Sequence, residues 1–365
     1  MFELECIKKA KTLNRKTDNL IKELKDVLTV FKNDYNLTGI DLSGQKTLRQ
    51  LIKLIPQRPP VRLPNKIYGN TTIFLSNYKI LISGGVKNTN QVTDDNYIYN
   101  IANSTRTLKT RLPEAITNHS AVVINNENVL FSGGLKGVNS GSRTLINIVY
   151  NITSNTYTNK RELRKERERH SANNISGSVY ILGGVEGEGI GVVNNKHVCF
   201  NYASNSYSAK TTSTALAGHS TSNTYSDTDY FFGYLIWGGI TNINNTVTNK
   251  CTVYWADTNV FANKVNMLNN RAFLTNVDLK NMTVLIAGGI RDASNYCLAS
   301  SIYSVNNDTY TAKANILEGK SNLTSVYIAN RHGAILIGGK DAELGSDKID
   351  YYDVNNNRYY RWWQT

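Results

Sequence analysis

The sequence predicts an all-β protein of six similar units behind a helical N-terminal segment, and two periodic features carry that prediction. Six Gly-Gly pairs end apolar runs at intervals of 49, 50, 55, 50 and 50 residues: Gly84-Gly85, Gly133-Gly134, Gly183-Gly184, Gly238-Gly239, Gly288-Gly289 and Gly338-Gly339. An aromatic residue follows each pair, and in five of the six units a second aromatic comes seven residues later. A strand-ending Gly-Gly in every unit of about fifty residues is typical of β-sheets repeated around an axis.

Residues 1–55 are predicted to be helical. Apolar and small residues recur there at alternating steps of three and four, which is a heptad seam: Cys6, Ala10, Leu13, Thr17, Leu20, Leu24, Val27 and Phe31. Leucine at one set of core positions, a β-branched residue at the other and a wide apolar stripe favour three or more helices over two. We therefore expect a trimeric oligomerisation or attachment segment, with a helix folded back onto its own domain as the alternative.

A proline-rich linker separates this segment from the repeats. A second short helix is predicted from Ser43, as its N-cap, to Ile55, because Pro56 stops it. Residues 56–60, Pro-Gln-Arg-Pro-Pro, are predicted to form a stiff extended linker. Residues 61–365 then form the repeated domain.

Each unit is predicted to contain four antiparallel strands. In the second unit these are residues 119–124, 129–132, 148–151 and 156–158, separated by turns rich in Asn and Ser. The two aromatics of a unit then face each other across its last hairpin, where such pairs stabilise a sheet. These pairs are Tyr150/Tyr157, Phe200/Tyr207, Tyr254/Phe261, Tyr303/Tyr310 and Tyr352/Tyr359, while the first unit has Tyr99 and Arg106.

The combination of strand, Gly-Gly, loop and Tyr-Asn/Asp-x-x-x-Asn-x-Tyr resembles the kelch repeat over residues 62–365. Kelch repeats usually carry Trp at the second aromatic position, where this chain has Tyr or Phe. The resemblance implies a six-bladed β-propeller whose blades are four-stranded antiparallel sheets. Because each blade is contiguous in sequence, the ring closes either by packing of blades 1 and 6 alone or by Val61-Arg62-Leu63 joining blade 6 as an edge strand.

Composition sets the chain apart from several classes. The net charge of +13 indicates solubility and a basic N-terminal stalk, in preference to contact with an anionic partner such as a teichoic-acid-like polymer or nucleic acid. No run approaches the roughly 18 apolar residues of a membrane span, and the N-terminus lacks the apolar core of a secretory signal, so neither membrane insertion nor Sec-type export is expected. Cys6, Cys199, Cys251 and Cys297 are spaced too widely for a usual zinc site or a disulfide framework, so buried thiols are predicted.

The long segments after the Gly-Gly pairs are predicted to emerge on one face of the disc, called the loop face below. Binding residues favour loops on a rigid scaffold, so its polar residues are the predicted ligand contacts: Arg143, Glu186, Glu188, Asn242, Arg291, Asp292, Asp341 and Glu343. His119, His170 and His219 begin strand one of three successive blades on the same face. Structural histidines are expected there in preference to a metal site, because no carboxylate accompanies them at a repeated position.

No pattern in the chain predicts catalysis. There is no Gly-x-Ser-x-Gly and no repeated pair of acids, so no catalytic residue, cofactor or metal is expected. The charged run at residues 160–169 is predicted to be a solvated loop or a single helical turn with internal ion pairs. Trp362 and Trp363 are expected to pack between blades in preference to stacking on a sugar.

The plan of helical rod, proline hinge and propeller resembles a receptor-binding protein of a phage tail fibre or phage-tail-like bacteriocin. Residues 47–55, Thr-Leu-Arg-Gln-Leu-Ile-Lys-Leu-Ile, also resemble N-terminal segments of tail proteins from Gram-positive hosts. The resemblance implies a homotrimer that docks on a baseplate or tail protein through residues 1–55 and binds a bacterial cell-surface polymer or protein with its loop face. It implies a protein made in the cytoplasm and incorporated into a virion or tail-like particle.

Two other functional classes stay open. One is an intracellular kelch adaptor for protein–protein interaction, although residues 1–55 show no recognisable partner-recruiting domain. The other is a sugar-processing enzyme such as a mutarotase, which a convergent acid or base on the loop face would favour.

Overall fold

The computed structural model describes residues 16–19, 21, 22, 25, 61–76, 78–138, 142–189, 191–223, 233–292, 294–341 and 345–362. The described residues between 16 and 25 are helical. The rest of the predicted heptad seam, the predicted helix at 43–55 and the linker at 56–60 lie outside the described residues. The compact unit that carries the repeats runs from Pro60 to Trp362. None of the described helices is long and apolar enough to cross a membrane.

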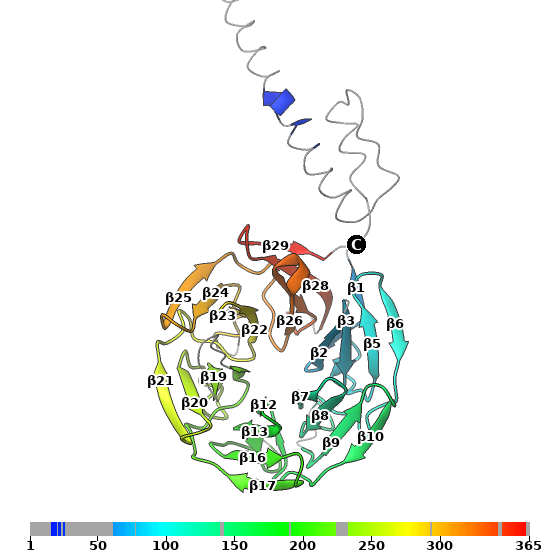
Figure 1. Ribbon diagram of the computed structural model, residues 1–365, viewed down its shortest axis with the longest axis vertical. Coiled ribbons are helices and arrows are strands. Elements are labelled where there is room, and N and C mark those ends of the chain that lie inside the picture. The colour runs from blue at the N-terminus through cyan, green and yellow to red at the C-terminus, as the bar shows by residue number, and fades with distance from the viewer. Residues whose placement is uncertain are drawn as a thin grey trace, which may run out of the picture. The chain divides into compact units, whose positions relative to one another are not determined.

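The repeats form six blades of four antiparallel strands, set around a central axis in the described part of the chain (Figure 1). This is the arrangement of a six-bladed β-propeller. Five blades are four-stranded sheets, and the sixth is part of a six-stranded sheet. From the axis outward, blade 1 has β2 (Thr71–Ser76), β3 (Lys79–Ser83), β5 (Asn96–Asn100) and β6 (Thr105–Leu108). Blade 2 has β7 (Ser120–Asn125), β8 (Asn128–Ser132), β9 (Asn147–Asn151) and β10 (Thr156–Asn159). Blade 3 has β12 (Ser171–Ile175), β13 (Ser178–Leu182), β16 (His197–Asn201) and β17 (Ser206–Ala209).

The second half of the ring repeats this order. Blade 4 has β18 (Ser220–Asn223), β19 (Gly233–Trp237), β20 (Cys251–Trp255) and β21 (Val260–Lys264). Blade 5 has β22 (Thr275–Lys280), β23 (Thr283–Ala287), β24 (Ser300–Ser304) and β25 (Thr309–Lys313). Blade 6 has β26 (Thr324–Ile328), β27 (Gly333–Ile337), β28 (Ser346–Asp353) and β29 (Arg358–Arg361), with the short 3-10 helix η1 (Ala329–Arg331) in its first turn.

The predicted strands of the second unit and the cross-strand aromatics are confirmed. All five aromatic pairs are direct partners across the outer hairpin, with ring centroids 4.7–4.9 Å apart. In blade 1, Tyr99 faces Arg106 at the same place. These pairs fix the register of the third and fourth strands, because a slip of one residue would turn each aromatic to the other side of the sheet.

The hydrophobic core lies between successive blades. One buried cluster, for example, joins Leu81 of blade 1 to Val129, Phe131 and Tyr150 of blade 2. Cys199, Cys251 and Cys297 are free and buried, which confirms the prediction for three of the four cysteines, while Cys6 lies outside the described residues.

Each Gly-Gly pair makes the joint to the next blade. The second glycine donates its N–H to a connector carbonyl of that blade, at 2.7–3.1 Å in all six joints; the pairs are Gly85–Ile116, Gly134–Arg167, Gly184–Leu216, Gly239–Arg271, Gly289–Lys320 and Gly339–Ile67. A Cβ on the first glycine would lie 2.1–3.0 Å from the same oxygen. The first glycines also have φ of 59–65°, a region that other residues rarely adopt. Glycine is therefore needed for both its conformation and its size.

The N-terminal strand of this unit closes the ring. β1 (Arg62–Tyr68) pairs with β28 of blade 6 and, at its other end, with β4 (Val86–Lys87) of blade 1. The N–H of Val61 donates to the carbonyl of Trp362 at 2.7 Å, and the buried indole of Trp362 donates to the carbonyl of Ile101 in blade 1 at 2.8 Å. Of the two predicted routes, closure by an added strand is the one that the structure shows. The strand is longer than the predicted Val61-Arg62-Leu63, and it pairs with blade 1 as well as with blade 6. The expectation that Trp362 packs between blades is confirmed, while Trp363 lies outside the described residues.

The prediction for the charged run at residues 160–169 is wrong for its last part. Arg167 and Glu168 form the short strand β11 (Arg167–Glu168), which pairs with β14 (Val185–Glu186), and β14 pairs with β15 (Val192–Val193). Both side chains are buried. Their burial is offset by ion pairs with residues of loops that follow the Gly-Gly pairs, Arg143 for Glu168 and Glu186 for Arg167. Within the run itself, Arg169 lies 3.5 Å from Glu168.

We predict that Gly238→Ala lowers stability far more than Gly177→Ala. Both glycines have a left-handed φ, 61° and 79°, so each alanine costs about 1–2 kcal/mol in backbone strain. A Cβ at position 238 also meets the Arg271 carbonyl at 2.1 Å, whereas one at position 177 meets nothing within 4 Å. Overpacking of this kind adds about 1–3 kcal/mol or more. Equal shifts in the urea unfolding midpoint for the two variants would contradict the joint.

Candidate functional site

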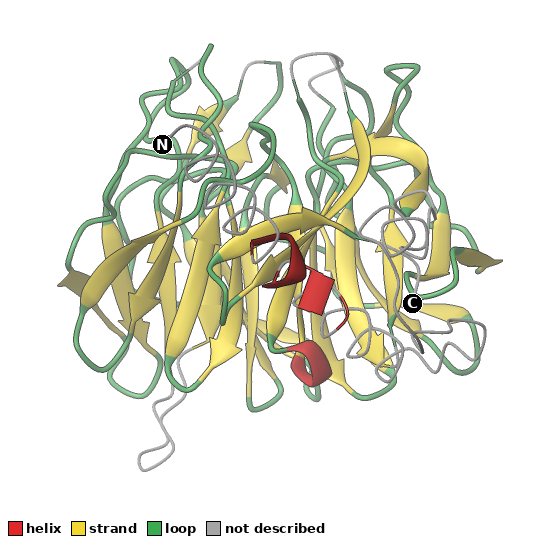
Figure 2. Cartoon of the chain, turned by 90° about the horizontal axis from the view of Figure 1, so that it is seen from above, coloured by secondary structure: helices red, strands yellow, loops and turns green. Residues whose placement is uncertain are grey.

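Longer connections gather at one edge of the disc and shorter turns at the other (Figure 2). The longer ones follow the Gly-Gly pairs, so this edge is the loop face. Their bases are fixed by bridges to the connector before strand one of the same blade: Thr117 to Leu135, Ala217 to Ile240, Ala272 to Ile290 and Ser321 to Lys340. The loop face is therefore a set of anchored loops around the axis.

The predicted contact residues fall into two groups on this face. Glu188, Asn242, Arg291 and Asp292 are exposed, Asp341 is half-buried, and Glu343 lies outside the described residues. Two of the exposed residues, Asn242 and Asp292, also make hydrogen bonds within their own loops. Asp292 accepts hydrogen bonds from Ser294 and Asn295, and the bond from the Asn295 side chain is the main cause that lowers the pKa of Asp292.

Arg143 and Glu186, in contrast, are buried in ion pairs. The Arg143 guanidinium lies 3.0 Å from the Glu168 carboxylate, and each of these side chains is only 4% exposed. Glu186 lies 2.7 Å from both Arg167 and Lys196. Their contact with a ligand stays a prediction, and their burial favours a role in holding the loops in place.

A ring of six left-handed residues surrounds the axis at the level of the loop face. One residue comes from each blade connector, with φ between 50° and 62°: Gly69, Asn118, Arg169, Gly218, Phe273 and Asn322. From Asn118 to Asn322, each donates its N–H to the carbonyl of the preceding member at 2.6–2.9 Å. We call this set the axial ring.

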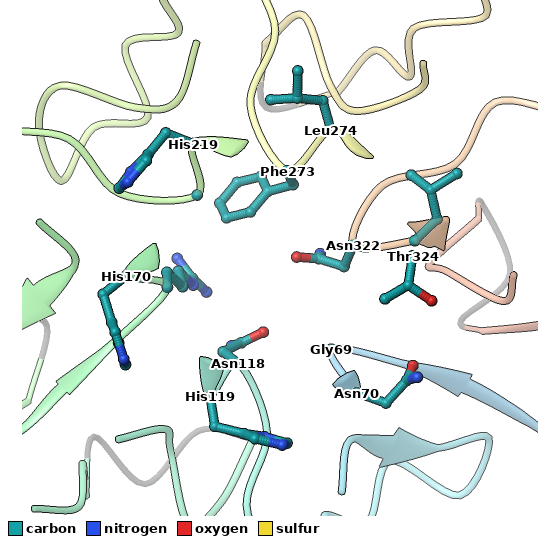
Figure 3. A pocket seen from close by; sticks show the side chains of 13 residues that line it. Gly69, Asn70, Asn118, His119, His170, His219, Phe273, Leu274, Asn322 and Thr324 are labelled. Atoms are coloured by element: carbon teal, nitrogen blue, oxygen red, sulfur yellow. The ribbon is translucent and has the colours of Figure 1, made fainter. Parts of the chain in front are cut away.

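Four side chains of the axial ring line a hollow of about 140 Å³ at the mouth of the axis, called the axial mouth. Asn118, Phe273 and Asn322 are labelled in Figure 3, and the fourth is Arg169. Asn118, Arg169, Phe273 and Asn322 are all partly exposed. The Asn118 side chain donates to Glu168 at 2.9 Å, and the Arg169 guanidinium lies 5.1 Å from the centre of the Phe273 ring. The mouth therefore joins one cation, one aromatic face and two amides.

A larger hollow of about 660 Å³ lies further along the axis, between the innermost strands of blades 1, 2, 5 and 6. Its lining is mostly apolar, with Phe74, Val123 and Val326 among its residues, and Lys280 as its charged member. Specific ligand sites combine an apolar wall with a few convergent polar groups. The axial mouth fits that description better, because its polar groups converge on one small space.

The three histidines of the mouth bind neighbouring blades. Each Nε2 lies at hydrogen-bond distance from a hydroxyl on the first strand of the preceding blade: Thr71 to His119 at 3.0 Å, Ser120 to His170 at 2.9 Å and Ser171 to His219 at 2.9 Å. Burial lowers the pKa of His119 to about 3 and that of His219 to about 4, and holds the pKa of His170 well below its usual value. Among the described residues, no group of three His, Cys, Asp or Glu side chains is placed to hold a metal ion.

Sequence reasoning missed the axial ring. The sequence singles out His119, His170 and His219. The ring residue is the one before each histidine, where Asn118, Arg169 and Gly218 share no residue type. Gly69 and Gly218 were the available signal, since glycine before a strand often marks a positive φ.

Comparison with known proteins supports the fold. No family model matches this chain, and no curated protein does. The chain is similar in fold to YjhT. The solved structure of that protein superposes with a TM-score of 0.66 over 82% of this chain and 98% of its own, at 14% sequence identity. At this identity the likeness shows the all-β propeller fold and nothing finer, so the kelch repeat stays a resemblance.

We predict that the buried histidines make the propeller sensitive to mild acid. A histidine with a folded-state pKa near 4 and an unfolded pKa near 6.5 gives stability that is present above pH 6.5 and is lost as the pH falls toward 4. For His219 the loss is about 2 kcal/mol at pH 5. His219→Leu, which copies Leu274 and Leu323 at the same place in blades 5 and 6, should remove that part of the pH dependence in urea unfolding at pH 7 and pH 5. An unchanged pH dependence would contradict this.

Proposed function

We propose that this chain is a receptor-binding protein of a phage tail or phage-tail-like particle. In this proposal the propeller binds a polymer or protein of the bacterial cell surface through its loop face. Residues 1–55 assemble the chain into a trimer and attach it to a tail or baseplate protein.

The chemistry of the axial mouth carries the binding part of the proposal. An aromatic ring, a guanidinium and two amides bind ligands by packing and hydrogen bonding. Burial lowers the pKa of His119 to about 3 and that of His219 to about 4, far from the near-neutral pKa that suits a general acid or base. A binding role fits this set better than acid–base catalysis.

The attachment part rests on the heptad pattern of residues 6–31 and on the compact unit that begins at Pro60. A rod that joins three propellers turns weak single contacts into tight multivalent binding. Linked sites gain about 10²–10⁴ in avidity without any new contact.

The proposal predicts that oligomerisation and cell binding separate at the linker. The full chain should have the solution mass of a trimer, and a fragment of residues 61–365 should be a monomer. Both should bind whole bacterial cells, and the apparent affinity of the fragment should be about 10²–10⁴-fold lower because avidity is lost. Light scattering gives the masses, and pull-down on intact cells gives the binding.

A monomeric full chain that binds neither cells nor purified wall polymers would contradict the proposal. That result would favour the adaptor class, in which the propeller binds a protein partner.

A further inference from the structure

The axial ring has six structurally equivalent positions, so the residue types that the chain places at them can be compared. Gly69 and Gly218 adopt a left-handed φ without strain, and Asn118 and Asn322 are of a type that tolerates it. Arg169, at φ 59°, and Phe273, at φ 54°, are held in the same conformation, in which larger side chains are strained. Glycine or asparagine would suffice at all six positions if the ring only closed the axis. Strained residues that persist in this way cluster at ligand sites.

The charge at the mouth favours an anion. Arg169 is the one charged side chain among the described residues that line the hollow, and it is 34% exposed. Its Nε lies 3.5 Å from Glu168, but that buried carboxylate already pairs with Arg143 at 3.0 Å. Two guanidinium groups thus share one carboxylate, which leaves a net positive charge facing the hollow. A guanidinium binds carboxylate and phosphate oxygens through paired N–H groups.

The rest of the mouth favours a ring or polyol that carries the anion. The Phe273 ring lies against Gly218, where a Cβ would come within 2.4 Å of it, so the glycine makes room for the ring. An aromatic face packs against the C–H groups of a sugar or polyol, and the Asn118 and Asn322 amides can pair with hydroxyls. The volume of about 140 Å³ is close to that of a cavity that holds one benzene ring, about 150 Å³. It suits a single unit of a polymer.

We propose that the axial mouth binds one acidic unit of a surface glycan or polyol polymer. Arg169 binds its carboxylate or phosphate, and Phe273 packs on its carbon skeleton. This inference rests on the proposed function and names its ligand class.

The test uses the full chain and three small probes: glucuronate for a carboxylate source, glycerol 1-phosphate for a phosphate source, and glucose as the neutral control. Binding is measured by ligand-observed NMR. We expect at least one acidic probe to bind tenfold or more tightly than glucose, and the better one identifies the source of the anion. Arg169→Asn should weaken that binding at least tenfold, and Phe273→Asn should weaken binding of both acidic probes.

Asparagine is the residue that the chain itself places in the ring at positions 118 and 322, so neither substitution should unfold the protein. We expect melting temperatures equal to or above that of the native chain, because strain is removed. Arg106→Asn is the matched control. It removes the same charge from the exposed outer strand of blade 1 and should leave probe binding unchanged.

Three results would overturn the site. The first is that the acidic probes bind no better than glucose, and the second is that Arg169→Asn binds the probes as tightly as the native chain. The third is that the native and Arg169→Asn chains bind cells equally well, a result that leaves the proposed function standing. The reverse result, a native chain that binds no cells but loses its acidic-probe binding on Arg169→Asn, supports the site and refutes the receptor-binding role.

Discussion

The glycine joint between blades is the contact on which the rest of the propeller depends. At each joint one carbonyl of the next blade accepts the N–H of the second glycine and lies against the first glycine, where a Cβ would come within 2.1–3.0 Å of it. The joint is the same at all six interfaces. This includes the one between Gly339 and Ile67, where no connector in the sequence leads from blade 6 to blade 1. β1 therefore completes the sixth interface in place of a covalent connector, and the buried Trp362 stabilises the same junction.

The joints also determine what the axis presents. They bring the six connectors together, and the axial ring follows from their close approach. A second set of polar bonds joins the innermost strands, or the histidine just before them, at every interface: Thr71–His119, Ser120–His170, Ser171–His219, Ser220–Asn276, Thr275–Ser325 and Thr324–Thr72. Because backbone and hydroxyl groups hold the blades, the side chains of Arg169 and Phe273 are not required for the joints. That freedom is what makes them candidates for ligand binding.

Features that repeat in the sequence could be predicted, and features that depend on unlike residues could not. The Gly-Gly pairs and the aromatics seven residues apart gave the blades and their outer hairpins, because each is a local pattern with a fixed period. Arg143 was predicted to be a surface contact, but its partner Glu168 lies 25 residues away in another segment, and no local pattern reveals that pairing. The axial ring could not be predicted from the sequence, because its members share a backbone conformation and not a residue type. Only the beginning of the closing strand could be predicted, since Val61, Arg62 and Leu63 cover no more than its first residues.

Amide hydrogen exchange of the second glycine in each pair tests the central claim most directly, since it reports on each joint separately. If β1 closes the ring by the same joint, the amide of Gly339 should be protected to within about tenfold of those of Gly85, Gly134, Gly184, Gly239 and Gly289, because all six open only when neighbouring blades separate. Exchange of Gly339 that is faster than the other five by a thousandfold or more would show that the ring is open between blades 6 and 1, and would contradict the account.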